Sequence, residues 1–214
     1  RFPSVKEVFA LGISMGGNAS GMLVAHPRAR RPDGKPLVDA LVAVEGVHNL
    51  VQEYATFSQV SAEFREDVEQ EAGGAPHEVP DRYLHLTNLA RVEEMAYLRS
   101  AILVHGVDDL LVQANQSRDM SKQLRRVGVP TELYTVVGRG DGEAGTTITG
   151  LAVDSAASDT GYESPIAGHG WEGSSSHLVI RLGFEQLWKV MRGKRVGPYR
   201  EVIVHGEGLR VPLP

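Results

Sequence analysis

A serine flanked by two glycines lies close to the start of the chain. Residues 12–16 have the sequence GISMG, which is a G-x-S-x-G pattern, and an apolar run at 8–11 precedes it. A stretch of small residues that can form a helix follows at 18–26. This order of strand, tight turn and helix exposes a serine hydroxyl as a nucleophile. The sequence therefore predicts Ser14 as a nucleophile, with the Met15 backbone N–H at the helix start as an oxyanion donor.

A serine hydroxyl needs a base to take its proton and an acid to orient that base. In chains with this type of turn, the acid and the base follow the serine in the order Asp, then His. Asp109 comes just after the apolar run 101–104, and His169 lies in a Gly-His-Gly turn before the last predicted helix. His177 is the alternative base, but it lies inside that predicted helix. The chain therefore offers Ser14, Asp109 and His169 as a catalytic set.

Two further segments carry a resemblance to a known family. Residues 105–112 read HGVDDLLV, and after a predicted helix residues 128–133 read GVPTEL. This pattern resembles the acid-bearing segment of α/β-hydrolases, and it is particularly similar to the prolyl oligopeptidase family and related esterases. The resemblance extends over residues 8–191. It implies that Ser14 is the nucleophile, Asp109 the acid rather than its neighbour Asp108, and His169 the general base, with the Met15 N–H in the oxyanion hole.

The elements that must position these residues follow an alternating pattern. Apolar or β-branched runs at 8–11, 40–46, 101–104 and 131–137 predict strands, and helical patterns lie between and after them at 113–127 and 176–191. Strands that alternate with helices predict an α/β fold with a mostly parallel sheet. A strand is also expected at 201–204, either at the sheet edge or as an arm across a neighbour, and a long loop at 138–167. We expect one domain over 1–214.

Residues 48–98 form a polar, charge-rich excursion with helical spacing at 61–71 and 89–98, separated by a loop at 73–76. Its position resembles that of a cap over an active site. Tyr54, Phe57 and His48 are therefore candidate substrate-binding residues, with core packing as the alternative. Val60 is a further candidate for the same pocket. His105, beside a strand end, is expected to make structural hydrogen bonds.

The resemblance also implies something outside this chain. The family's sheet has strands before the nucleophile, and its second oxyanion N–H comes from a loop after an early strand. The chain shows neither and begins with Arg1 rather than Met. We therefore expect the C-terminal portion of an α/β-hydrolase fold, whose open sheet edge is covered by a complementary N-terminal chain or a second copy.

Composition limits the other function classes. The chain has 214 residues, 42% hydrophobic and 23% charged, as in ordinary globular proteins. Its net charge of −5 gives little support for nucleic-acid binding. There is no cysteine for a disulfide or thiolate, and no apolar run approaches the roughly 20 residues of a membrane span. No metal or cofactor is expected, since the Asp154 and Asp159 pair lacks ligand spacing. The compartment is not indicated.

These observations favour a serine hydrolase that cleaves a carboxylic ester, or transfers its acyl group, through an acyl-enzyme. A peptidase or amidase of the prolyl oligopeptidase type is the first alternative, because the same residues cleave both bonds. An inactive scaffold that binds a ligand or partner is the second, because a fold alone does not imply activity.

Overall fold

A computed structural model gives the fold of residues 5–60, 62–107, 109, 111–137, 169 and 173–205. Five parallel strands form one sheet in the order β1-β2-β3-β4-β5. They are β1 (Phe9–Ile13), β2 (Ala40–Val44), β3 (Ser100–Gly106), β4 (Thr131–Val137) and β5 (Tyr199–His205). This arrangement confirms the predicted α/β class. The segment 201–204, expected as an edge strand or an arm, is part of β5 and lies at the sheet edge beside β4. The long loop predicted at 138–167 lies outside the described residues.

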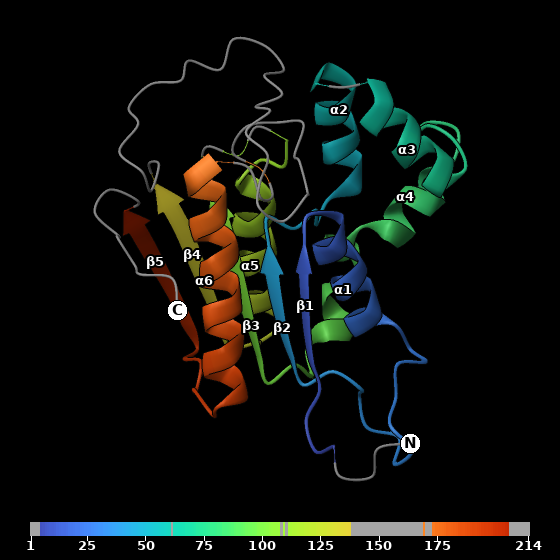
Figure 1. Cartoon of the computed structure of the whole chain (residues 1–214). Coiled ribbons are helices and arrows are strands. Elements are labelled where there is room, and N and C mark those ends of the chain that lie inside the picture. Colours follow the sequence, from blue (N-terminus) through green and yellow to red (C-terminus); the bar gives the residue numbers. More distant parts are fainter. Residues whose placement is uncertain are drawn as a thin grey trace.

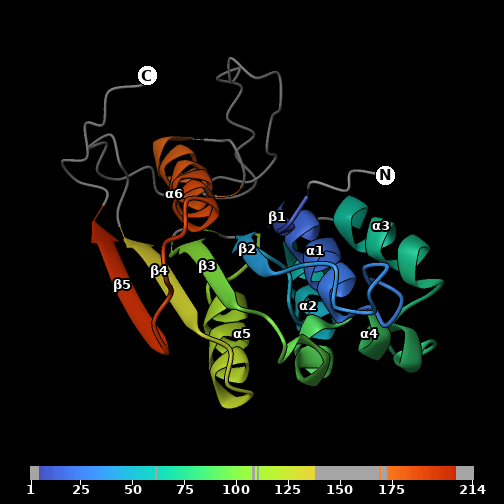
Figure 2. The ribbon, with the colours of Figure 1, turned by 90° about the horizontal axis from the view of Figure 1, so that it is seen from below.

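Helices cover both faces of the sheet (Figures 1 and 2). α1 (Met15–Ala25), the 3-10 helix η1 (Asn88–Met95) and α5 (Asn115–Arg126) pack on one face, and α6 (Gly173–Met191) packs on the other. Alternate strand residues supply the two cores: Leu41, Ala43 and Leu103 on the α1 face, and Val42, Val44 and Val104 on the α6 face. The two-residue period of a strand produces this division, and burial on both faces explains the continuous apolar runs.

The excursion after β2 contains α2 (Leu50–Val60), α3 (Ala62–Ala72) and α4 (Pro80–Leu86) before η1. α2 and α3 lie beyond the ends of β1 and β2 at which Ser14 and the β2 loop emerge (Figure 1). They have their own apolar cluster, which includes Leu50, Phe57, Val68 and Tyr83. The excursion is joined to α1 by Asn18, whose buried side-chain amide donates to the carbonyls of Val47 and Leu86 at 3.0 and 2.9 Å.

Some boundaries differ from the sequence prediction. α1 begins at Met15 rather than in the stretch from 18, because the chain turns into the helix directly after Ser14. The segment expected to be helical at 89–98 is a 3-10 helix over Asn88–Met95, with a kink at Arg91. Within the described residues, no helix combines the length and the apolar character required to cross a lipid bilayer.

Candidate active site

Ser14 occupies a sharp turn between β1 and α1. Its φ of 55° and ψ of −127° are unfavourable for a residue with a side chain. Hydrogen bonds hold the turn in place: the Ser14 N–H donates to the Val44 carbonyl at 2.9 Å, and the Ser14 carbonyl accepts from the Gly17 N–H at 2.9 Å. The sheet and the first helical turn thus fix a strained backbone at Ser14, which lines a cavity.

The two glycines of the G-x-S-x-G pattern are required to different extents. A Cβ atom at Gly12 would overlap the Gly16 carbonyl oxygen, which is backbone and cannot move aside, whereas a Cβ at Gly16 would meet nothing within 4 Å. A Cβ at Gly17 would lie 2.7 Å from the Gly46 Cα. Close packing of α1 therefore depends on Gly12 and Gly17, and Gly16 is not sterically required.

This difference gives a matched pair of stability predictions. Gly12→Ala is expected to lower the free energy of unfolding by at least about 2 kcal/mol, because the new methyl overpacks the turn. Gly16→Ala is expected to leave the free energy unchanged or to raise it by up to about 1 kcal/mol, because alanine favours a helix over glycine. Urea denaturation of both variants measures the difference. Equal losses would contradict the packing described for the turn.

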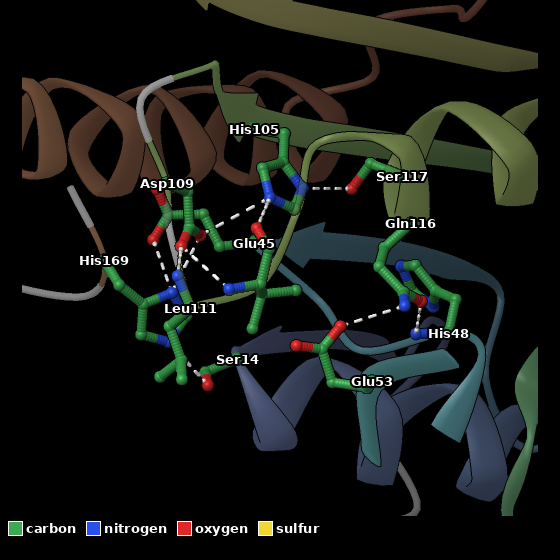
Figure 3. A network of polar contacts seen from close by, with 11 residues as sticks. Ser14, Glu45, His48, Glu53, His105, Asp109, Leu111, Gln116, Ser117 and His169 are labelled. Atoms are coloured by element: carbon green, nitrogen blue, oxygen red, sulfur yellow. Dashed lines mark hydrogen bonds and ion pairs between the residues drawn. The ribbon is translucent and has the colours of Figure 1, made fainter. Parts of the chain in front are cut away.

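Ser14, His169 and Asp109 meet at the same edge of the sheet (Figure 3). His169 Nε2 lies 2.8 Å from Ser14 Oγ, and His169 Nδ1 lies 2.8 Å from Asp109 Oδ2. The other Asp109 oxygen accepts hydrogen bonds from the N–H groups of Leu111 and Val112 at 3.0 and 2.8 Å. The three predicted residues thus form one hydrogen-bonded chain, with the carboxylate held by backbone amides.

The alternative acid and base are not described in comparable detail. Asp108 lies outside the described residues. His177 lies in α6, within a stretch whose side chains the structure does not describe.

Met15 is the first residue of α1 and lines the cavity beside Ser14. The first N–H groups of a helix have no acceptor within that helix, so the Met15 amide is available to a ligand atom near Ser14.

The charges around His169 favour its protonated form. Burial of the ring lowers its pKa, but the negative charge of Asp109 and their hydrogen bond outweigh this effect, and Glu45 and Glu53 add to it, so the pKa is raised to about 8. Burial alone would raise the pKa of Asp109, yet the charge of His169 and hydrogen bonds from His105 and His169 hold it below its usual value. The pair is therefore arranged to stabilise an imidazolium next to a carboxylate.

His105, at the end of β3, supports the acid. Its Nδ1 lies 2.8 Å from Ser117 Oγ and its Nε2 lies 2.7 Å from the Val112 carbonyl oxygen. Because that carbonyl only accepts, Nε2 carries the proton and Nδ1 accepts from the Ser117 hydroxyl. Nε2 is also 3.4 Å from Asp109 Oδ2. These contacts agree with the structural hydrogen bonds expected of His105.

A cavity of about 370 Å³ opens beside Ser14 and His169. Its apolar wall consists of Ile13, Met15, Phe57, Phe64, Val68 and Leu111, and Asp67 and Glu71 of α3 lie at its border. Three of these six wall residues, Phe57, Phe64 and Val68, come from α2 and α3, so the excursion supplies half of the apolar wall. The size falls within the range of small-molecule sites.

Of Tyr54, Phe57 and His48, only Phe57 lines this cavity, and the side chain of Val60 lies outside the described part of the structure. The Tyr54 hydroxyl donates to Glu69 Oε1 at 2.6 Å, and its ring packs edge-on against Tyr83. His48 is fully buried, with its Nδ1 3.3 Å from the Asn88 amide nitrogen, and burial lowers its pKa to about 3. Tyr54 and His48 thus hold the excursion together, because their polar groups are directed to neighbouring helices rather than to the pocket.

Two buried carboxylates near the site were not among the predicted residues. Glu45 directly follows β2, and its Oε2 lies 3.7 Å from His169 Nδ1. Glu53 on α2 is fully buried and accepts a hydrogen bond from Gln116 Nε2 at 2.9 Å. Burial and the nearby Asp109 charge raise the pKa of Glu53 to about 8. A charged residue at the end of an apolar strand was the available signal for Glu45, whereas nothing distinguishes Glu53 from its polar neighbours in the sequence.

Glu45, Asp109 and His169 form the one group of described residues that could hold a metal ion together. The donor atoms of Glu45, Asp109 and His169 lie within 4.8 Å of one another. The Nδ1 atom that would have to bind the ion is already engaged with Asp109. The arrangement fits proton transfer better than metal ligation.

Sequence comparison identifies the family. The sequence profile of the prolyl oligopeptidase family matches residues 2–144, about two thirds of the chain. The chain belongs to the prolyl oligopeptidase family. The match includes Ser14 and Asp109 and ends before His169. A comparison with curated protein sequences gives no match.

Two acylaminoacyl peptidase structures share the fold of this member of the prolyl oligopeptidase family. Uncomplexed acylaminoacyl peptidase from Pyrococcus horikoshii superposes with a TM-score of 0.54 at 16% identity, over 88% of this chain and 24% of that chain. An acylaminoacyl peptidase in complex with Z-Gly-Gly-Phe-chloromethyl ketone gives 0.53 at 16% identity, over 89% and 24%. A propionate-bound esterase from Thermogutta terrifontis gives 0.49 at 18% identity, over 87% and 56%. The chain thus spans about a quarter of the peptidase chains.

Proposed function

We propose that the chain carries the catalytic residues of a serine hydrolase that cleaves carboxylic esters through an acyl-enzyme. Ser14 is the nucleophile, His169 the general base and Asp109 the acid that orients it. The observation that carries the proposal is the unbroken series of 2.8 Å contacts from Ser14 Oγ through both ring nitrogens of His169 to Asp109. These contacts match the roles that the chemistry requires.

The reaction follows from this geometry. Ser14 Oγ attacks the acyl carbon while its proton moves to His169 Nε2, and the Met15 N–H stabilises the charge that develops on the acyl oxygen. The imidazolium formed at that point is stabilised by Asp109. His169 Nε2 then gives the proton to the departing alcohol as the bond to that oxygen breaks. Water, activated by the same ring nitrogen, hydrolyses the acyl-enzyme and returns the proton to Ser14.

The cavity supports a substrate with a compact apolar acyl group. Phe57, Phe64 and Val68 provide an apolar surface next to Ser14, and the volume limits the group that can be enclosed.

Peptide or amide cleavage is the second candidate. Membership of the prolyl oligopeptidase family favours it, because that family is named for a peptidase activity. The two bonds differ in the leaving group. A triad that acylates from an amide also acylates from an ester of the same acyl group, since an alcohol leaves more readily than an amine, but the reverse does not hold. Ester cleavage is therefore the minimum activity that the site supports.

Paired substrates test the proposal. We expect turnover of p-nitrophenyl esters with short acyl chains, together with a burst of p-nitrophenol if deacylation is slower than acylation. Comparison with p-nitroanilides of the same acyl groups separates an esterase from a peptidase. Absence of turnover with every ester and anilide would contradict the hydrolase proposal and favour a binding role for the scaffold.

A further inference from the structure

Glu45 occupies an unusual backbone position at the catalytic edge of the sheet. It directly follows β2, whose neighbours β1 and β3 lead to Ser14 and Asp109. The Glu45 N–H donates to the Val104 carbonyl at 2.8 Å, and its φ is 48°. Among the described non-glycine residues, Ser14 alone shares a positive φ. Strained backbone of this kind is concentrated at functional sites, which directs attention to the Glu45 side chain.

The Glu45 carboxylate approaches the same ring nitrogen as the Asp109 carboxylate (Figure 3). Glu45 Oε2 lies 3.7 Å from His169 Nδ1, and Asp109 Oδ2 lies 2.8 Å from it. Neither carboxylate is exposed to solvent, and only 3% of the His169 side chain is. Asp109 makes the hydrogen bond, while Glu45 acts at ion-pair distance. Charges in such a buried setting are weakly screened, so both carboxylates favour the imidazolium.

Other titratable groups contribute to the field at His169. Glu53 on α2 favours the imidazolium, as Glu45 does, only when Glu53 is ionised, and its own pKa is raised to about 8. Asp67 and Glu71 lie at the border of the cavity, where solvent screens them. His105 faces Asp109 from β3 at 3.4 Å. Among these groups, only Asp109 and Glu45 lie within ion-pair distance of His169, at 2.8 and 3.7 Å.

We propose that Glu45 is a second positioning carboxylate for His169, which acts beside Asp109 to stabilise the imidazolium and to hold the ring toward Ser14. The catalytic meaning of this role rests on the proposed function, in which His169 accepts the Ser14 proton. Glu45 touches no reacting atom and acts only through His169. Its contribution is greatest when the ring is charged, and this is the state formed during acylation.

Histidine titration by NMR tests the proposal without any need for turnover. His169 is assigned among the eight histidines by the signal lost in His169→Gln. In the wild-type protein its pKa is expected near 8. In Glu45→Gln, which keeps the side-chain shape and removes the charge, the pKa is expected to fall by about one unit. An unchanged pKa in a folded Glu45→Gln variant would overturn the proposal.

Two variants guard against structural effects. Glu132→Gln is the matched control, because Glu132 is a buried carboxylate on β4 that pairs with Lys194 at 2.6 Å, near the opposite end of the sheet. It is expected to leave the His169 pKa unchanged, and an equal shift there would also overturn the proposal. If Glu45→Gln does not fold, Glu45→Asp replaces it. The shorter side chain moves the carboxylate away from His169, so the His169 pKa should fall by less than one unit. An unchanged His169 pKa in this variant would contradict the proposal.

The rate of Ser14 labelling by a fluorophosphonate, measured against pH, separates this proposal from the proposed function. The neutral His169 ring is the base, so the labelling rate should rise as the pH increases through the His169 pKa. In Glu45→Gln this rise should occur at lower pH. If Glu45→Gln is labelled normally and the rise in its labelling rate stays at the wild-type pH, the role of Glu45 is rejected and the hydrolase proposal is retained. A shifted pKa without labelling in any variant would reject the hydrolase and retain the coupling of Glu45 to His169.

Discussion

Replacing Ser14 by alanine is expected to lower kcat for ester hydrolysis by on the order of 10⁶-fold, to the level that oxyanion stabilisation and binding alone support. The alanine removes the only atom that bonds to the acyl group. His169 keeps its contact with Asp109, so the fold should be preserved. The measurement is kcat with a short-chain p-nitrophenyl ester.

Ser58→Ala is the matched control for this variant. Ser58 is exposed on α2, and its hydroxyl donates to the Tyr54 carbonyl at 2.8 Å within the helix. Loss of this hydroxyl is expected to leave kcat within about twofold of the wild-type value, because surface substitutions have small effects. A Ser14→Ala variant as active as Ser58→Ala would show that turnover does not pass through an acyl group on Ser14.

Replacing His169 by alanine is expected to cause a loss of similar size. The variant leaves Ser14 without a base and Asp109 without the ring it orients. Residues that act as a unit are not additive, so the double variant Ser14→Ala with His169→Ala should lose no more than either single variant. Steady-state kcat for the three variants tests this.

His177→Ala distinguishes between the two candidate bases. His177 follows His169 by only eight residues and belongs to α6. We expect this variant to keep most of the wild-type kcat. If His177→Ala abolished turnover while His169→Ala retained it, the assignment of His169 as the base would be wrong, despite its 2.8 Å contacts with Ser14 and Asp109.

The sequence predicted most of the sheet because its strands are buried on both faces. Runs such as 40–46 and 101–104 are apolar without interruption, and the glycine turns at their ends mark the edge where side chains of the site meet. The order of Ser14, Asp109 and His169 along the chain was enough to name three residues that the fold brings within hydrogen-bonding distance.

Sequence patterns of this kind could not predict contacts that depend on how separate elements pack together. Glu45 and Glu53 are buried because neighbouring elements cover them, and their sequence context does not reveal that cover. Tyr54 and His48 were candidates for the pocket, with core packing as the alternative. Their contacts with Glu69 and Asn88 direct their polar groups to other helices of the excursion, which agrees with the packing alternative. A partner chain along β1 stays a prediction, as does the loop at 138–167.

The position of the covalent adduct formed with a fluorophosphonate tests the central claim most directly. Mass spectrometry of the digested, labelled protein should place the phosphonyl group on Ser14, with no labelling in Ser14→Ala and strongly slowed labelling in His169→Ala. An adduct on another residue, or no adduct in a folded wild-type protein, would contradict the assignment of Ser14 as the nucleophile.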